Sequence, residues 1–201
     1  MTESHDNFPA KVSNFTLEQR VYQGKTFEFF KDPPTILSRP GEAICLPFGI
    51  EVEGRFTARP HFAGGTDTRN HLSVQIAVGS ETAAAIRGAE EAFAAKTALS
   101  GDWASAVTEK NGRYLFKTRL IVSASPNLSR FRCGAEGPLC SGWPALEELL
   151  SQDLRGALGR VAVMPVKIWK MQGSVGCTWR ILQLDVEPRT QEVKDYFADA
   201  Y

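Results

Sequence analysis

Apolar and polar positions alternate along several stretches of this chain, which predicts a protein built mainly from β-strands. The clearest stretch runs from Val161 to Val186, where two runs rich in Val, Ile, Thr and Trp flank Gln172-Gly173-Ser174. A glycine beside polar residues suits a tight reversal, so this stretch predicts a β-hairpin. The same alternation predicts strands at His71–Val78 and Arg113–Ser123.

The pattern before residue 60 is weaker and leaves alternatives open. Val21–Phe30 is rich in aromatic and β-branched residues but contains Gly24, so a short hairpin and an irregular edge strand fit equally well. Ala43–Val52 predicts a strand that Pro47 interrupts, which favours a sheet edge or a bulge. Strand-like alternation continues over Glu51–Arg59.

Two segments have the composition of helices. Ser80–Leu99 is rich in alanine and begins with a serine that can cap a helix, and its narrow apolar stripe suits a helix lying on a sheet. Pro144–Leu158 begins with a proline suited to a first helical turn and carries a continuous stripe of leucines. The paired glutamates of these segments are expected on solvated helix faces; they are Glu90-Glu91 and Glu147-Glu148.

The order of elements is strands, helix, strand, helix and hairpin, with irregular links expected at Gly101–Gly112 and Pro126–Pro144. Doubly wound parallel sheets need nearly continuous apolar strands, whereas these strands are half polar. We therefore predict a mainly β (α+β) fold, in which an antiparallel barrel or curled sheet carries two helices. Residues 1–20 are expected to form an arm, 21–187 one domain and 188–201 a tail.

Composition narrows the class of protein further. With 201 residues, 43% of them hydrophobic, the chain can bury a proper core. It lacks the apolar run of roughly 18 residues needed to span a membrane and the pattern of a signal peptide, so we expect a soluble intracellular protein without a membrane partner. Four cysteines in such a chain favour reduced thiols, and the spacing of Cys133 and Cys140 does not suit zinc. No GxxxxGK[ST] or GxGxxG motif is present, and we expect no cofactor.

The formal net charge is zero, but the charges are unevenly distributed. From Asp185 onward five acidic residues stand against two basic ones, and the residues before Lys11 hold two acids and no base. The segment from Lys11 to Leu184 therefore carries an excess of five basic residues. A mildly basic body with an acidic tail is compatible with a polyanionic partner.

Aromatic and basic side chains gather on two of the predicted strands, at one end of the terminal hairpin and at one end of Arg113–Ser123. Aromatic rings can stack on bases, and lysine or arginine beside them can neutralise phosphates, which is how single-stranded nucleic acids are bound without sequence preference. The candidate nucleic-acid-binding residues are Tyr114, Phe116, Lys117, Arg119, Lys167, Trp169, Lys170, Trp179 and Arg180.

A structural role for these side chains stays open. A tryptophan in a strand is more often part of the core, and a neighbouring lysine or arginine often forms the rim of that core. The two tryptophans of the hairpin are expected to differ. Trp179 shares its predicted face with Cys177 and Ile181 and suits the core, whereas Trp169 shares its face with Lys167 near the open turn.

The C-terminal half resembles a known family. After the second predicted helix come an apolar strand, K-x-W, a glycine turn, and then G-C-T-W-R-I-L-Q-L, followed by an acidic tail with Tyr196, Phe197 and Tyr201. Over about residues 110 to 201 this pattern resembles the OB-fold single-stranded DNA-binding proteins of short-tailed phages and large DNA viruses. The matching residues are Lys167, Trp169, Gly173, Gly176, Cys177, Thr178, Trp179, Leu182 and Gln183.

The resemblance implies an OB-like five-stranded antiparallel Greek-key barrel that binds single-stranded DNA in viral-type DNA replication or recombination. It also implies an acidic tail that competes with DNA and docks replication proteins, and a location in the cytoplasm or nucleus of a host cell if the protein is viral. A homodimer is compatible with the sequence.

Two other classes of function are alternatives to DNA binding. One is a non-catalytic interaction or assembly module of a virus or replication complex, in which Trp169, Trp179 and Tyr114 would serve the core or a protein interface. The other is an enzyme, which lacks support because His5, His61 and His71 are scattered and no nucleophile or metal cluster has a recognisable spacing. We therefore expect no catalytic activity.

Overall fold

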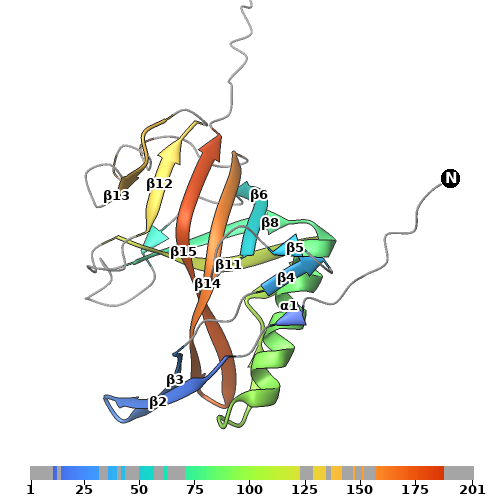
Figure 1. Cartoon of the computed structure of the whole chain (residues 1–201), viewed down its shortest axis with the longest axis vertical. Coiled ribbons are helices and arrows are strands. Elements are labelled where there is room, and N and C mark those ends of the chain that lie inside the picture. Colours follow the sequence, from blue (N-terminus) through green and yellow to red (C-terminus); the bar gives the residue numbers. More distant parts are fainter. Residues whose placement is uncertain are drawn as a thin grey trace, which may run out of the picture.

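The computed structural model (Figure 1) describes residues 11–12, 15–31, 36–39, 42–43, 50–56, 61–62, 71–122, 129–134, 137–141, 147, 151 and 157–187. For residues 11–12, for Leu158 and for the described residues between positions 36 and 62, the structure describes the backbone but not the side chains. The strands are β1 (Lys11–Val12), β2 (Leu17–Tyr22), β3 (Lys25–Phe30), β4 (Ile36–Arg39), β5 (Glu42–Ala43), β6 (Ile50–Phe56), β7 (His61–Phe62), β8 (His71–Val78), β9 (Asp102–Ala104), β10 (Val107–Lys110), β11 (Arg113–Ile121), β12 (Arg130–Cys133), β13 (Cys140–Ser141), β14 (Leu158–Met171) and β15 (Ser174–Glu187), and the helix is α1 (Ser80–Lys96).

Twelve of these strands form one mixed sheet, and β1, β4 and β5 form a second, small one. Five strands of the large sheet pair in a cyclic order: β6 with β8, β8 with β11, β11 with β15, β15 with β14, and β14 with β6. Strands β12 and β13 extend the sheet beyond β15, and β3 and β2 extend it beyond β14. Figure 1 shows β14 and β15 running the length of the molecule, with β12 and β13 at one end and β2 and β3 at the other.

The predicted fold class is confirmed only in its coarse form, as a mainly β protein. The prediction of an antiparallel sheet is wrong, because β15 pairs in parallel with β9, β11 and β12. The cycle of five strands is joined between β11 and β15 by only two partner pairs, Arg119↔Arg180 and Leu120↔Ile181. Hydrogen bonds therefore do not seal the sheet into a barrel along its length.

Tight turns fix the registers of the hairpins. Gln23-Gly24 joins β2 to β3, Asn111-Gly112 joins β10 to β11, and Gln172-Gly173 joins β14 to β15, all with positive φ at both turn residues. Two-residue turns of this kind match the natural twist of a hairpin. The hairpin predicted over Val161–Val186 is confirmed, and of the two alternatives for Val21–Phe30 the hairpin is correct.

Two irregularities in the β14–β15 hairpin reverse which face its side chains occupy. The register shifts between Ala162 and Val163, where Leu182 has no partner, and between Pro165 and Lys167, where Val166 has none. An extra residue turns every later side chain to the other face of the sheet. The side chains of β14 that point into the core are therefore Val161 and Val163 before the Val166 bulge and Ile168 after it. Those of β15 are Cys177, Trp179 and Ile181 before the irregularity at Leu182, and Leu184 and Val186 after it.

Helix α1 packs an aromatic cluster against the sheet. Phe93 is fully buried and contacts the rings of Phe15, Phe30 and Trp179, at centroid distances of 5.3, 4.9 and 5.9 Å. The buried carboxylate of Glu28 on β3 accepts hydrogen bonds from the hydroxyl of Thr97 and the backbone N–H of Ala98, just after the helix. These contacts join the β2–β3 hairpin to the end of α1.

Several predicted elements differ in the structure. The helix expected over Ser80–Leu99 ends at Lys96, and Gly79, not Ser80, is its N-cap. The links expected at Gly101–Gly112 and Pro126–Pro144 contain β9, β10, β12 and β13. Of the second expected helix, Glu147 and Ser151 are described as helical and most of the rest lies outside the described residues.

Other expectations fall on the ends of the chain. The arm expected over residues 1–20 contains β1 and the start of β2, while its first ten residues lie outside the described ranges. The acidic tail at 188–201 also lies outside them, so its roles in competition and partner docking stay predictions. No helix in the described part of the chain is long and apolar enough to cross a membrane.

Candidate nucleic-acid interface

One face of the sheet combines aromatic and basic side chains from five strands. Cross-strand partners share a face. One row runs from Phe29 through Lys167 to Thr178, and the next from Phe27 through Trp169 to Gly176. We call this surface the aromatic–basic face; its members are Arg20, Phe27, Phe29, Lys117, Arg119, Lys167, Trp169 and Arg180.

Lys167 lies at the centre of this face. Its Nζ atom lies 4.7 Å from the ring centroid of Phe27 and 5.9 Å from that of Phe29. The guanidinium of Arg20 also lies over the ring of Phe29, 5.2 Å from its centroid. Because Phe27 and Phe29 are only half-buried, their rings stay accessible beside the cations.

The basic residues of the face crowd one another. Arg119 and Arg180 are direct partners across β11 and β15. Burial lowers the pKa of Lys167 below its ordinary value, and the charge of Arg119 lowers it further. Burial also lowers the pKa of Arg119 and of Arg180. The pKa of His71 on β8 is lowered by burial and then by the charges of Arg119 and Lys167.

A pocket of about 280 Å³ opens in this face beside Trp169. Lys117, Arg119, Trp169 and Thr178 line it together with the segment Ala104–Ala106. The indole of Trp169 lies across Gly176, where an added Cβ would come within 2.6 Å of the ring carbon Cζ2 and 2.8 Å of the Ala104 carbonyl oxygen. A glycine is therefore needed here for the indole to form the wall of the pocket.

Two buried polar atoms on this face lack a hydrogen-bond partner among the described residues: Oγ1 of Thr178 and Nε of Arg180. Within the described part of the chain, the Nη2 atom of Arg180 donates to the thioether of Met164 at 3.2 Å, and a thioether is a weak acceptor. Thr178 lines the pocket, whereas Arg180 lies on the same face outside the pocket lining. Buried polar groups are normally satisfied, so unpartnered donors on this face indicate where an acceptor such as a phosphate oxygen can bind.

Five of the nine residues predicted from the sequence meet on this face: Lys117, Arg119, Lys167, Trp169 and Arg180. The alternation in the sequence predicts that Val161, Val163, Lys167 and Trp169 share one face of the strand. The bulge at Val166 instead places Lys167 and Trp169 on the aromatic–basic face, opposite to the buried side chains of Val161 and Val163. Lys170 lies on the other side of β14, where its Nζ atom donates to the hydroxyl of Ser100 at 3.3 Å.

The remaining three predicted residues point inward. Phe116 and Trp179 are 0% and 1% exposed and contact each other edge to face. Tyr114 is half-buried under the guanidinium of Arg87 from α1, which lies 5.3 Å from its ring centroid. Stacking on a base needs an open ring face, so burial excludes Phe116 and Trp179 from that role. The expected difference between Trp169 and Trp179 in position is confirmed.

The sequence pattern missed three residues that shape the site. Phe27 and Phe29 were available as alternate positions of Val21–Phe30, but their pairing with β14 joins segments far apart in the chain. Glu90 was expected on a solvated face and is instead 1% exposed. It accepts hydrogen bonds from the indole of Trp179 and the backbone of Ala106, both at 3.0 Å, and from the indole of Trp103 at 3.5 Å.

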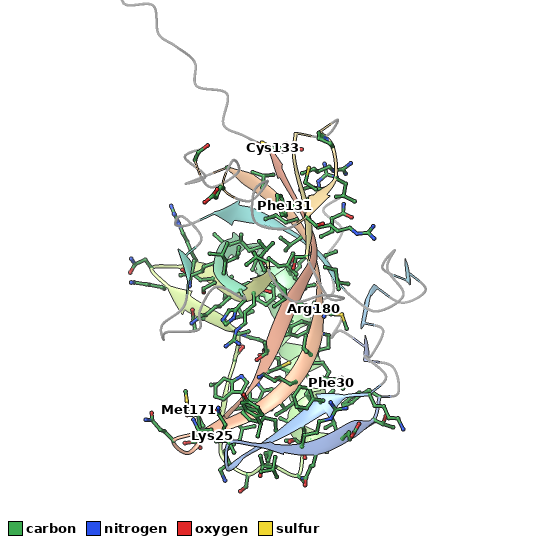
Figure 2. All side chains as sticks on the ribbon, turned by 90° about the vertical axis from the view of Figure 1, so that its left-hand side faces the viewer. Lys25, Phe30, Phe131, Cys133, Met171 and Arg180 are labelled. Atoms are coloured by element: carbon green, nitrogen blue, oxygen red, sulfur yellow. The ribbon has the colours of Figure 1, made fainter. Side chains whose placement is uncertain are left out.

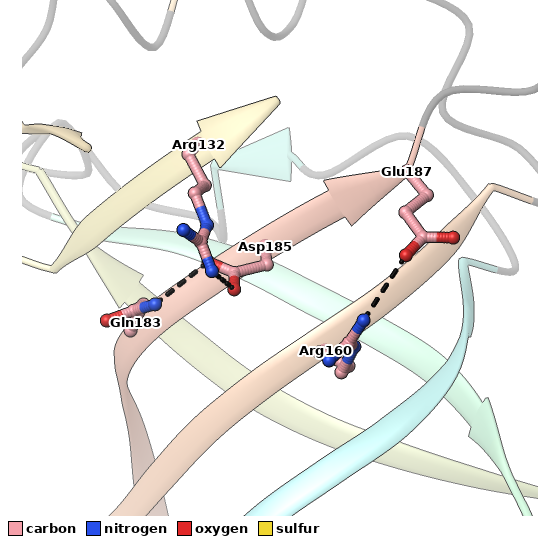
Figure 3. Close-up of polar contacts among 5 residues, drawn as sticks. All are labelled: Arg132, Arg160, Gln183, Asp185 and Glu187. Atoms are coloured by element: carbon pink, nitrogen blue, oxygen red, sulfur yellow. Dashed lines mark hydrogen bonds and ion pairs between the residues drawn. The ribbon is translucent and has the colours of Figure 1, made fainter. Parts of the chain in front are cut away.

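A second polar cluster lies at the far end of β15 (Figure 3). Arg132 donates to Asp185 at 2.6 Å and Gln183 donates to it at 2.9 Å, while Arg160 pairs with Glu187 at 3.4 Å. Burial raises the pKa of Asp185, but the hydrogen bonds from Arg132 and Gln183 and the nearby positive charges hold it below its ordinary value. These arginines are thus paired with carboxylates, as Arg20 is with Glu18, whereas Lys117, Arg119, Lys167 and Arg180 form no ion pair among the described residues.

The described residues contain no group of three His, Cys, Asp or Glu side chains that could hold a metal ion. Cys133, Cys140 and Cys177 are not joined by disulfide bonds, and burial raises the pKa of the Cys177 thiol well above its ordinary value.

No family model matches this chain, and neither does any curated protein sequence. Among solved structures it is similar to the single-stranded DNA-binding protein from bacteriophage Enc34, with a TM-score of 0.49 and 11% identity over 94% of this chain and 99% of that chain. The same protein in complex with ssDNA gives a TM-score of 0.47 and 12% identity over 87% and 96%. Its C-terminal truncation gives 0.46 and 11% over 87% and 95%. TM-scores below 0.5 are too low to support a function. A functional proposal therefore has to rest on the side chains of this chain.

Proposed function

We propose that the protein binds single-stranded DNA through the aromatic–basic face, without strong sequence preference. The observation that carries this proposal is the group of Lys117, Arg119, Lys167 and Arg180. None of the four forms an ion pair with a carboxylate of the described residues. A polyanion would relieve their mutual repulsion and would also offset the cost of partly burying Arg119, Lys167 and Arg180.

The aromatic members of the face suit bases. Phe27, Phe29 and Trp169 are half-buried, so each is held in place while part of its surface stays open. A base stacked on such a ring contributes about 1–3 kcal/mol, and every base has a flat face that can do this. Bases of a duplex are already stacked on one another, so these rings favour a single strand.

The strand order supports an OB-type arrangement. In chain order, β6, β8, β11, β14 and β15 occupy the places of OB strands 1 to 5, and the cycle of pairings joins them. OB-folds bind oligonucleotides on the face of strands 2 and 3 and on the loop between strands 4 and 5. Here Lys117 and Arg119 come from the third of these strands, and Trp169 lies beside the turn between the fourth and fifth.

A fluorescence titration with oligo-dT over a series of salt concentrations tests the proposal. Four phosphate contacts on a single strand predict that log Kobs falls against log salt with a slope of roughly −2 to −3. Lys167→Gln and Arg119→Gln should each lower the steepness of the slope by roughly 0.7. Lys110→Gln, at an exposed position of β10, is the matched control and should leave the slope unchanged. An absence of binding at low salt would refute the proposal.

A further inference from the structure

The outer edge of β2 is open within the described part of the chain. Strand β2 ends the order of the large sheet, pairing with β3 on one side and with no described strand on the other. Its last five residues are exposed, with Val21 at 72% and Tyr22 at 65%. Figure 2 shows Lys25, next to the β2–β3 turn, at the same end of the molecule as Met171 and opposite to Cys133. An open strand edge offers a row of backbone donors and acceptors.

The direction of these backbone groups follows from the register. The backbone carbonyl of Thr16 accepts a hydrogen bond from the N–H of Lys31 at 3.0 Å, so the backbone polar groups of Thr16 point toward β3. Backbone groups alternate along a strand, so Glu18, Arg20 and Tyr22 also bond to β3. The N–H and C=O groups of Leu17, Gln19 and Val21 therefore point outward.

We propose that the outer edge of β2 pairs antiparallel with β2 of a second copy of this chain, centred on Gln19. In this register the two Gln19 residues lie opposite each other, and Leu17 lies opposite Val21. All outward N–H and C=O groups over this span then meet partners. Antiparallel pairing of a strand with itself is a closed two-fold contact, so it gives a dimer and not a fibre.

Charge favours this register over the alternative. Glu18 and Arg20 lie on one face of β2, where they form an exposed ion pair at 3.3 Å. In the antiparallel register Glu18 of each copy lies directly opposite Arg20 of the other, so opposite charges meet at the close, non-hydrogen-bonded positions. An in-register parallel pairing would instead place Glu18 against Glu18 and Arg20 against Arg20, which is unfavourable.

The dimer would extend the proposed DNA site, a consequence that rests on the proposed function. Arg20 is the cross-strand partner of Phe27, so the charged face of β2 is continuous with the aromatic–basic face. A two-fold axis perpendicular to the sheet keeps that face on the same side in both copies. One strand of DNA could then cross both faces.

A charge exchange in the absence of DNA tests the pairing. Glu18→Arg leaves two arginines on the strand and Arg20→Glu leaves two glutamates, so each variant alone meets like charges. Sedimentation velocity should show the wild type dimerising with concentration and each variant dissociating at least about tenfold more readily. An equimolar mixture of the two variants should restore the dimer, because each arginine then meets a glutamate. A monomeric wild type, or a mixture no better associated than its components, would overturn the proposal.

A second pair of variants separates the edge from other surfaces. Val21→Pro removes one outward N–H without touching the bonds to β3, and Val21→Thr is its matched control. We expect the proline variant to be monomeric and the threonine variant dimeric, both with unchanged circular dichroism. Removal of residues 188–201 should leave the dimer intact; loss of the dimer would show that the tail, not a second β2, occupies the edge.

The two proposals fail in different ways. If Val21→Pro and the wild type are both monomers yet bind oligo-dT, the pairing is wrong and the proposed function stands. If the wild type dimerises but binds no oligo-dT at low salt, the pairing stands and the proposed function is wrong.

Discussion

Replacing Glu90 by alanine should destabilise the protein strongly, because this buried carboxylate fastens three segments together. Trp179 of β15 and the backbone of Ala106 both donate to it at 3.0 Å, and Trp103 approaches at 3.5 Å. Alanine would leave the indole N–H of Trp179 buried without an acceptor. It would also release the segment that lines the pocket beside Trp169.

The size of the expected loss in stability follows from the two hydrogen bonds of 3.0 Å. A hydrogen bond to a charged group contributes about 1.5–3 kcal/mol, and an unsatisfied buried donor costs about 1–3 kcal/mol. The variant no longer has to bury a charge, which offsets part of this loss. We expect a net loss of about 2–4 kcal/mol in the free energy of unfolding, or about 5–15 °C in melting temperature for a chain of this length.

Urea denaturation followed by tryptophan fluorescence measures the loss. Glu91→Ala is the matched control, since Glu91 is the next residue of α1 and is exposed; it should change the free energy of unfolding by less than about 0.5 kcal/mol. Glu90→Gln keeps one acceptor oxygen and should lie between the two. If Glu90→Ala and Glu91→Ala are equally stable, the buried hydrogen bonds of Glu90 do not stabilise the fold and this account of Glu90 is wrong.

Three further predictions concern the aromatic rings of the aromatic–basic face, His71 beside that face, and the ion pairs at the far end of β15. Phe27→Ala and Trp169→Ala should each weaken oligo-dT binding by about 1–3 kcal/mol, whereas Met171→Ala at the exposed hairpin tip should not; equal losses in all three would argue against stacking. The NMR-measured pKa of His71 should lie below its ordinary value and rise when oligo-dT is added, since phosphates offset the charges of Arg119 and Lys167; an unchanged pKa would place the DNA elsewhere. Because the folded pKa of His71 is the lower one, its contribution to stability is present above the unfolded pKa and is lost as pH falls through the folded pKa. Asp185→Asn should lower the melting temperature more than Glu187→Gln at neutral pH, with the difference vanishing as pH falls through the lowered folded pKa of Asp185; equal effects at neutral pH would contradict the difference in burial between the two ion pairs.

Local sequence signals were sufficient for elements whose contacts are local. The terminal hairpin, the strand at His71–Val78 and the alanine-rich helix follow from periodicity and turn residues, and all three are present. The short strands at Asp102–Ala104 and Arg130–Cys133 could not be found in this way. Each pairs in parallel with β15, a strand far away in sequence, so partners and not propensity define them.

The candidate site shows the same division. The sequence grouped Lys167 with Trp169 and Lys117 with Arg119 correctly, because residues two apart on a strand share a face. It could not show that an extra residue at Val166 turns Lys167 and Trp169 away from the core, since a bulge has no fixed sequence signature. It also gave no reason to bring Phe27 to Lys167, a contact made only when β3 pairs with β14.

The location of the bound strand is the most direct test of the central claim. Ultraviolet cross-linking of oligo-dT to the wild-type protein, followed by mass spectrometry of the digested complex, identifies the side chains in contact with thymine. We predict cross-links in the peptides that contain Phe27, Phe29 or Trp169, and none in the peptide of β12 that contains Phe131. Binding of oligo-dT with cross-links confined to residues outside the aromatic–basic face would contradict the account.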